Sequence, residues 1–213
     1  YIKIICRRRA GVMNDLEYSA GAVSKGFWFQ EFKKYMQMLK EGMDAAEIKK
    51  LQEKENVLLA PSPAYGKKMV GEISKRTKAL PKEILGLFFN INVSDQKLIN
   101  LLGIMITDRL FFEYMYEVYR ENLIIGTKNF EDSSIRIFFK NKSEQNKKVA
   151  EYTEQTKKRL GTAYKTYLRE ANLIVEENGI LIYHKPIIDI SLEEHMKSPS
   201  LYPYLKALTG VVE

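Results

Sequence analysis

Apolar residues recur at intervals of three and four along much of the chain, which is the spacing of one face of an α-helix. Phe32, Tyr35, Met36 and Leu39 show this spacing near the beginning of the sequence. The first half of the chain is therefore predicted to be a series of amphipathic helices. We expect these helices at residues 26–40, 44–53, 66–79, 81–89, 95–107 and 108–122.

Residues that favour helix starts stand in front of several of these segments. Asp44 is a good N-cap, and Glu47 three residues later gives a pattern close to a capping box. Pro81 suits a first helical turn, and Ser94 is the expected cap of the helix that follows it. The segment 108–122 is apolar nearly all round, which predicts a central, buried helix.

The pattern changes after Gly126, which marks a joint in the chain. Residues 135–139 fit either the end of a helix or a short strand, and residues 143–152 predict one short helix. Thr153 can cap a longer helix that continues to Ala171. A short helix, a tight turn and a longer helix are therefore expected in this order.

A β-hairpin is expected directly after the longer helix. Asn172 can end that helix in a left-handed turn. Two apolar, β-prone runs follow at residues 173–175 and 180–183, and Asn178-Gly179 between them is a strong signal of a tight hairpin turn. Two helices followed by a hairpin is the order of a winged helix-turn-helix.

The predicted fold class is all-α with one small β-hairpin. A helical N-terminal domain at residues 13–125 is expected to precede a winged helix-turn-helix-like C-terminal domain at residues 126–213. Residues 1–12 do not fit a secretory signal, because their three arginines follow a very short apolar stretch instead of preceding a longer one. Met13 is followed by a polar start, so residues 1–12 are expected to be a non-native or disordered leader. The alternative is an arginine arm that reaches DNA.

Cysteine usage and hydropathy bear on the compartment. Cys6 is the single cysteine of the chain, so an internal disulfide is impossible and a reducing compartment is favoured. The sequence contains no run of about 18 apolar residues, so we expect no membrane-spanning helix. The protein is therefore predicted to be cytoplasmic, without a membrane partner.

The longer helix near residue 160 has two chemically different faces. One face is apolar and is expected to pack into the core through Leu160, Tyr164, Tyr167, Leu168 and Ala171. The other face carries Lys158, Thr162, Lys165 and Arg169, which are three cations and a threonine with no acid among them. Such a stripe suits phosphate groups and the major groove of DNA.

Positive charge is concentrated in two blocks of the chain, whose formal net charge is +7 and whose pI is about 9.2. Residues 133–172 carry ten Lys or Arg against four Glu, a local +6, and residues 61–89 carry six against two, a local +4. Cations that neutralise phosphates release counterions, which supplies most non-specific affinity for DNA. Glutamine in the first turn of a recognition helix can also bond adenine.

We therefore predict that the protein binds double-stranded DNA. The expected contacts in the C-terminal block are Lys147, Lys148, Gln155, Lys157, Lys158, Thr162, Lys165 and Arg169. A second contact surface is expected at Lys67, Lys68, Lys75, Arg76 and Lys78. The rival hypothesis is a scaffold that docks other proteins through the same C-terminal module and does not bind DNA.

Signals for catalysis or metal binding are weaker. His184 and His195 are eleven residues apart, which is no known zinc spacing. The row of Glu113, Glu117 and Glu121 could hold a divalent ion for nuclease chemistry, but ion pairs with neighbouring Lys and Arg are the more common use of such a row. No phosphate loop or nucleophile elbow is present. We therefore predict no catalytic activity, no metal and no cofactor.

Short motifs in a fixed order resemble a known family. The motifs are Glu17-Tyr18-Ser19-Ala20, Phe29-Gln30-Glu31-Phe32, Asp108-Arg109-Leu110-Phe111-Phe112-Glu113, Ile137-Phe138-Phe139, Val149-Ala150-Glu151-Tyr152-Thr153, Thr156-Lys157-Lys158-Arg159-Leu160 and Leu168-Arg169-Glu170-Ala171-Asn172-Leu173-Ile174. Their order and spacing resemble BrxA, the family of small accessory proteins of BREX phage-defence systems, over about residues 14–210. The resemblance implies a helical, two-part DNA-binding protein with helix-turn-helix character. It also implies work beside a BREX methyltransferase, an AAA+ ATPase and a phosphatase-like protein.

Overall fold

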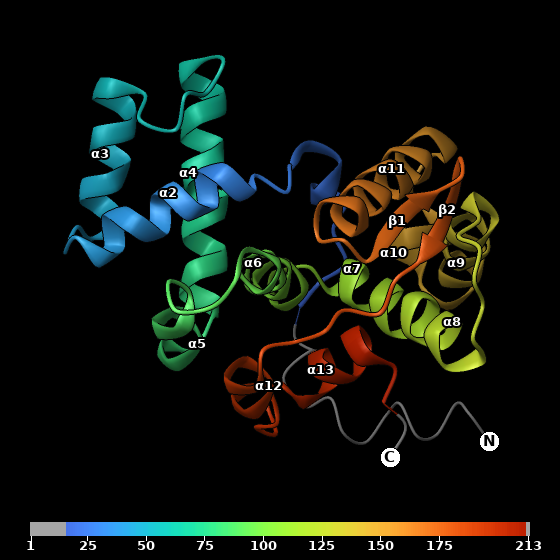
Figure 1. Cartoon of the computed structure of the whole chain (residues 1–213). Helices are drawn as coiled ribbons and strands as arrows, with labels where there is room; N and C mark the ends of the chain where they lie inside the picture. Colours follow the sequence, from blue (N-terminus) through green and yellow to red (C-terminus); the bar gives the residue numbers. More distant parts are fainter. Residues whose placement is uncertain (1–15, 212–213) are drawn as a thin grey trace.

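A computed structural model describes residues 16–211, so the leader expected at residues 1–12 lies outside the described residues. The predicted fold class is confirmed, because helices make up most of this structure and two antiparallel strands form a hairpin (Figure 1). The elements before residue 108 are a 3₁₀ turn η1 (Gly21–Ser24), α2 (Phe29–Lys40), α3 (Ala45–Glu55), α4 (Pro63–Ala79), α5 (Lys82–Leu87) and α6 (Val93–Thr107).

The second half of the chain holds shorter elements and the hairpin. These are α7 (Arg109–Tyr114), a π turn η2 (Met115–Tyr119), α8 (Arg120–Ile125), α9 (Asp132–Gln145), α10 (Lys147–Ala150), α11 (Glu154–Glu170), β1 (Ile174–Glu177), β2 (Ile180–Tyr183), α12 (Ile190–Met196) and α13 (Tyr202–Thr209). Figure 1 shows α2, α3 and α4 on one side of the molecule and α9, α11 and the hairpin on the other, with α6 and α7 between them.

Helix starts follow the capping residues, with one correction to the caps. The Asp44 carboxylate accepts hydrogen bonds from the backbone amides of Ala46 and Glu47, at 2.7 and 2.8 Å, and the capping box is complete. The prediction that Ser94 caps α6 is wrong. The Asn92 side chain accepts a hydrogen bond from the Asp95 amide instead, and the helix begins two residues earlier than predicted.

Two further corrections concern the helix predicted at residues 26–40 and the helix predicted at residues 108–122. Trp28 adopts a left-handed φ of 52°, so α2 begins at Phe29 instead of residue 26. The predicted helix at 108–122 begins after its cap Asp108, but a π turn interrupts it at Met115–Tyr119. The extra residue per turn changes which side chains face the core beyond that point.

Local signals around α11 are confirmed. The Thr153 hydroxyl accepts from the Thr156 amide at 3.1 Å, and Asn172 takes a left-handed φ of 57° after the helix. Asn178 and Gly179 both have positive φ and join strands in which Glu177 pairs with Ile180. The five apolar residues predicted to face the core are all buried, namely Leu160, Tyr164, Tyr167, Leu168 and Ala171.

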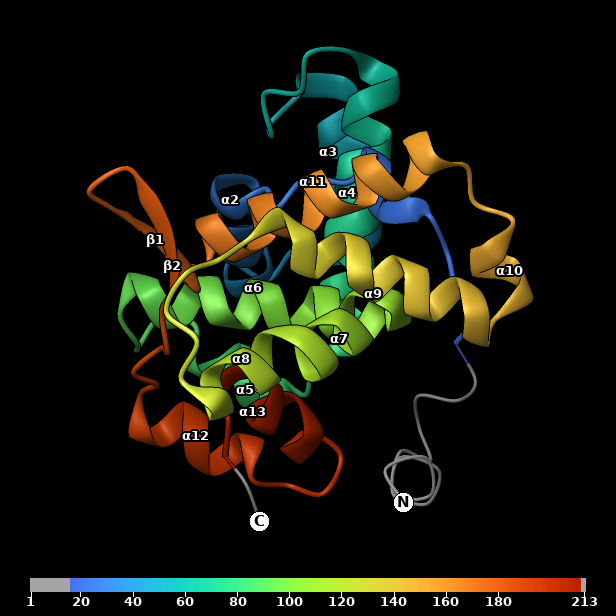
Figure 2. The ribbon, with the colours of Figure 1, turned by 90° about the vertical axis from the view of Figure 1, so that its right-hand side faces the viewer.

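The segment before α11 differs from the prediction in detail. Residues 135–139 lie inside α9, which decides between the helix and the strand that the pattern left open. The predicted helix at 143–152 is two pieces, because α9 continues to Gln145 and Asn146 then caps α10. Figure 2 shows α9 lying along α11, with α10 at the turn between them.

Apolar side chains of both halves form a single core cluster. The Tyr167 hydroxyl on α11 donates to the Lys25 carbonyl at 2.7 Å, and the Tyr119 hydroxyl donates to the His184 carbonyl at 2.6 Å. α13 also packs against α8 and η2. The domain boundary at residues 125/126 stays a prediction, and the two sides of it are in close contact.

Candidate nucleic-acid interface

The predicted basic stripe of α11 lies on the surface of the protein. Lys158, Thr162 and Arg169 are exposed, and Lys165 is partly exposed. With about 100° of rotation per residue, all four lie roughly opposite Tyr167, whose ring is buried against the N-terminal half. The core contacts of α11 therefore direct the stripe outward.

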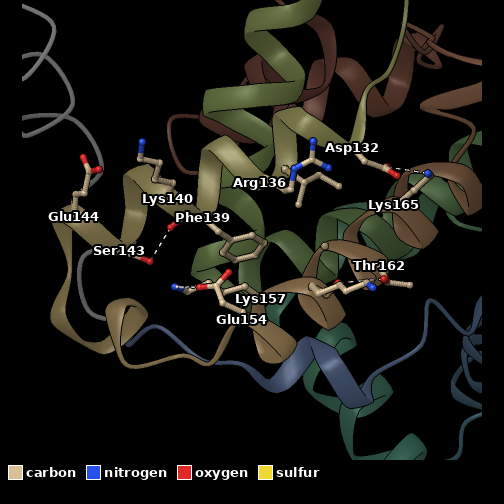
Figure 3. A pocket seen from close by; sticks show the side chains of 13 residues that line it. Asp132, Arg136, Phe139, Lys140, Ser143, Glu144, Glu154, Lys157, Thr162 and Lys165 are labelled. Carbon is tan, nitrogen blue, oxygen red and sulfur yellow. Dashed lines mark hydrogen bonds and ion pairs between the residues drawn. The ribbon is translucent and has the colours of Figure 1, made fainter.

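A groove of about 1040 Å³ runs between α9 and α11, next to this stripe (Figure 3). Lys157, Lys158 and Lys165 line it from α11, and Arg136 and Lys140 line it from α9. Arg136 and Lys140 are exposed and one helical turn apart, and neither is among the DNA contacts predicted from the sequence. Their i, i+4 spacing could have revealed them, had residues 135–139 been assigned to a helix.

Gly161 allows the two helices that form the groove to approach each other closely. A Cβ atom at this position would lie 2.7 Å from Cγ2 of Ile135, which is closer than real Cβ atoms come to other atoms. Ile135 and Phe139 form the apolar floor of the groove, and its sides carry the five cations together with the acids Asp132, Glu144 and Glu154. The groove thus presents charge on its edges and no buried charge at its base.

Four of the predicted cations form ion pairs with carboxylates. Three of these carboxylates lie outside the helix that carries the cation. The pairs are Lys148–Glu17 at 2.6 Å, Lys157–Glu154 at 3.0 Å, Lys165–Asp132 at 2.8 Å and Arg169–Glu176 at 3.3 Å. The hydrogen bond between Lys148 and Glu17 raises the pKa of the ammonium group and lowers that of the carboxyl group. Solvent screens exposed pairs of this kind, so a phosphate can displace such a carboxylate at little cost.

The remaining cations of the interface have no such partner among the described residues. No carboxylate of residues 16–211 lies within 4.0 Å of the charged groups of Lys147, Lys158, Arg136 or Lys140. Gln155 is exposed in the first turn of α11. The groove therefore brings Lys157, Lys158, Thr162 and Lys165 of α11 next to Arg136 and Lys140 of α9, whereas the other predicted residues of α10 and α11 do not line it.

Four residues of the second predicted surface are exposed, so DNA contact there stays a prediction, and the fifth residue is buried. Lys67, Lys68, Lys75 and Lys78 are exposed on α4, whereas Arg76 is only 2% exposed. Its guanidinium donates to the carbonyl oxygens of Gly26 and Phe27, at 2.7 and 2.8 Å, and to Oδ1 of Asn100. Arg76 lies on the inward side of the helix because it is nine residues, or about 180°, from Lys67.

Burial lowers the pKa of Arg76 to about 10. The guanidinium remains charged at neutral pH, and the three acceptors replace the water that it has lost. Arg76 therefore holds α4 to the chain segment at residues 26–27 and cannot contact DNA.

The acidic row of α7, η2 and α8 is taken up by ion pairs. Glu113 contacts Arg109 at 2.9 Å and the buried Lys142 at 2.6 Å, and Glu117 also contacts Lys142 at 2.6 Å. Glu121 pairs with Arg120. Burial raises the pKa of Glu117. Within residues 16–211, no three His, Cys, Asp or Glu side chains gather as a metal-binding group would require.

The two histidines are engaged with nearby backbone. Nδ1 of His184 lies 2.9 Å from the carbonyl oxygen of Asn172, and Nδ1 of His195 lies 2.7 Å from that of Ser191.

Among the described residues, no helix has the length and apolar character needed to span a bilayer.

Fold and surface together define a mainly α-helical protein with a β-hairpin beside a basic helix. The chain belongs to the BrxA family, because the BrxA family model matches residues 16–200. The BREX protein BrxA of Bacillus cereus (strain H3081.97) is 30% identical over 199 residues, which cover 93% of this chain and all of that protein. The resemblance found in the sequence motifs is thereby confirmed.

A solved structure has a similar fold. The crystal structure of an uncharacterized protein from Magnetospirillum magneticum superposes with a TM-score of 0.75, covering 92% of this chain and 100% of that one. The two sequences are 12% identical, so the likeness concerns the fold alone.

Proposed function

We propose that this protein binds double-stranded DNA through α11 and the adjoining groove, as a non-catalytic accessory component of a BREX phage-defence system. The observation that carries the DNA proposal is the concentration of cations from α9 and α11 along one groove. The BREX assignment rests on membership of the BrxA family and on the name of the relative from Bacillus cereus.

In this proposal α11 enters the major groove of the duplex. Its first turn then presents Gln155 and Lys158 to base edges, while Lys165 and Arg169 lie along the phosphates. Arg136 and Lys140 extend the contact to phosphates on the α9 side of the groove. The hairpin that follows α11 serves as the wing of a winged helix-turn-helix.

The protein is proposed to act beside catalytic partners. Its acidic row is occupied by Lys142, Arg109 and Arg120, which supports an accessory role. Family membership supports a methyltransferase, an AAA+ ATPase and a phosphatase-like protein as those partners. A cytoplasmic location, where these partners and phage DNA would meet, completes the proposal.

Fluorescence anisotropy with a labelled 30-base-pair duplex tests DNA binding by the full chain. We expect affinity to fall steeply with salt, with a log–log slope of about 0.9 for each phosphate neutralised. Absence of binding at 50 mM salt would contradict the proposal. The rival scaffold role would then be supported. In that case the ion pairs of Lys165 and Arg169 would only stabilise the fold of the protein.

The ion pairs at the interface predict variants that bind DNA more tightly. Asp132→Asn and Glu176→Gln free Lys165 and Arg169 and remove a charge that repels phosphate. We expect each substitution to raise affinity roughly threefold, the size of an exposed pair. Glu53→Gln and Glu83→Gln, on exposed and distant positions, are the matched controls. Equal gains in both sets would show that only net charge matters and would contradict direct competition.

A further inference from the structure

The exposed side of α4 is a second basic face, and it is less neutralised than the face of α11. Lys67, Lys68, Lys75 and Lys78 fall within an arc of about 100° on this helix. None of them has a carboxylate of the described residues within 4.0 Å. Ala64 and Gly71 lie inside the same arc and are exposed, and a Cβ on Gly71 would meet nothing within 4 Å. A phosphate backbone can therefore come close to this face between the lysines.

One edge of the buried side of α4, at Arg76, is directed toward the half of the molecule that contains α11. Arg76 donates to the carbonyls of Gly26 and Phe27. The Phe27 ring lies 6.3 Å from the ring of Tyr167 on α11, whose hydroxyl binds the carbonyl of Lys25. The segment at residues 25–27 thus lies between α4 and α11, as Figure 1 shows.

The two basic faces point in different directions. On α4, Lys67 and Lys78 lie roughly opposite Arg76, which points toward the intervening segment, whereas Lys75 and Lys68 lie about 100° and 80° from it. On α11, Lys158 lies about 180° from Tyr167, which points toward the same segment from the other side. Neither face is therefore directed at the segment between the two helices.

We infer that the protein holds two segments of duplex DNA at once, one on α11 and one on α4. Duplex DNA is stiff over about 150 base pairs, so a short straight duplex that lies along one of these diverging faces cannot also follow the other. Two separate duplexes, or two distant parts of one long molecule, satisfy both faces without bending. This inference rests on the proposed DNA binding by α11.

A bridging assay with the full chain tests the inference. One 30-base-pair duplex is fixed to beads through biotin, a second carries a fluorophore, and the fluorescence retained by the protein is measured. The α4-face variant combines Lys67→Glu, Lys68→Glu, Lys75→Glu and Lys78→Glu. It is expected to lose more than about nine-tenths of the retained duplex while still binding a single duplex in anisotropy.

A control variant carries the same charge change at exposed lysines elsewhere, with Lys34→Glu, Lys49→Glu, Lys54→Glu and Lys82→Glu. It is expected to retain the second duplex. Bridging that survives in the α4-face variant, or that both variants lose equally, overturns the inference. If the unmodified protein binds one duplex but retains no second, this inference alone fails. If it binds no duplex at all, the proposed function fails with it.

Discussion

Reversing three charges on α11 is expected to abolish most of the DNA affinity of the protein. In the variant with Lys158→Glu, Lys165→Glu and Arg169→Glu, three phosphate contacts are lost and three repulsive charges are introduced. We expect the affinity for a 30-base-pair duplex at about 0.1 M salt to fall roughly 100-fold, and the salt slope to fall by about three. Anisotropy at several salt concentrations measures both quantities.

We expect the fold to tolerate these three replacements. Lys158 and Arg169 are exposed, and the ion pairs of Lys165 and Arg169 are at the surface. A control variant with Lys34→Glu, Lys49→Glu and Lys82→Glu changes the net charge by the same amount at other exposed positions. If both variants lose affinity equally, the stripe on α11 is only a solvated face and the proposed interface is wrong.

Replacing Arg76 is expected to destabilise the protein far more than replacing the exposed Lys75 beside it. Arg76→Met leaves the carbonyls of Gly26 and Phe27 buried without their donor, together with Oδ1 of Asn100. We expect the free energy of unfolding to fall by about 3 kcal/mol. Chemical denaturation, followed by circular dichroism, measures this loss.

Two further variants separate the contribution of the hydrogen bonds of Arg76 from the contribution of its charge. Arg76→Lys keeps the charge but lacks the planar fork that reaches three acceptors, so it should recover only part of the stability. Lys75→Met, on the neighbouring exposed position, should change the free energy of unfolding by less than about 0.5 kcal/mol. Equal stability of Arg76→Met and Lys75→Met would contradict the anchoring role of Arg76.

Much of the secondary structure follows from signals that are local in the chain. Thr153 caps α11 and Asn172 ends it because capping and left-handed turns involve residues only a few positions apart. Asn178-Gly179 forms the hairpin turn for the same reason. The motif order that identified the BrxA family is likewise a property of the sequence alone.

Local signals were insufficient where neighbouring alternatives compete. Ser94 and Asn92 both suit a helix cap, and the hydrogen bond to Asp95 selects Asn92. The π turn at Met115–Tyr119 leaves no mark in the sequence, because four of its five residues are apolar or aromatic, like those of the helical turns on either side. A period of 3.6 residues therefore predicted one continuous helix there.

The amphipathic period of α11 determined from the sequence which of its faces is buried and which carries the cations, because side chains three and four positions apart share a face. The role of each cation was decided only by the tertiary structure. Arg76 is an internal anchor because carbonyls from residues 26 and 27, fifty positions away in the chain, meet it. Lys165 is paired because Asp132 approaches it from α9. Charge partners of this kind depend on the packing of distant segments, which no local spacing specifies.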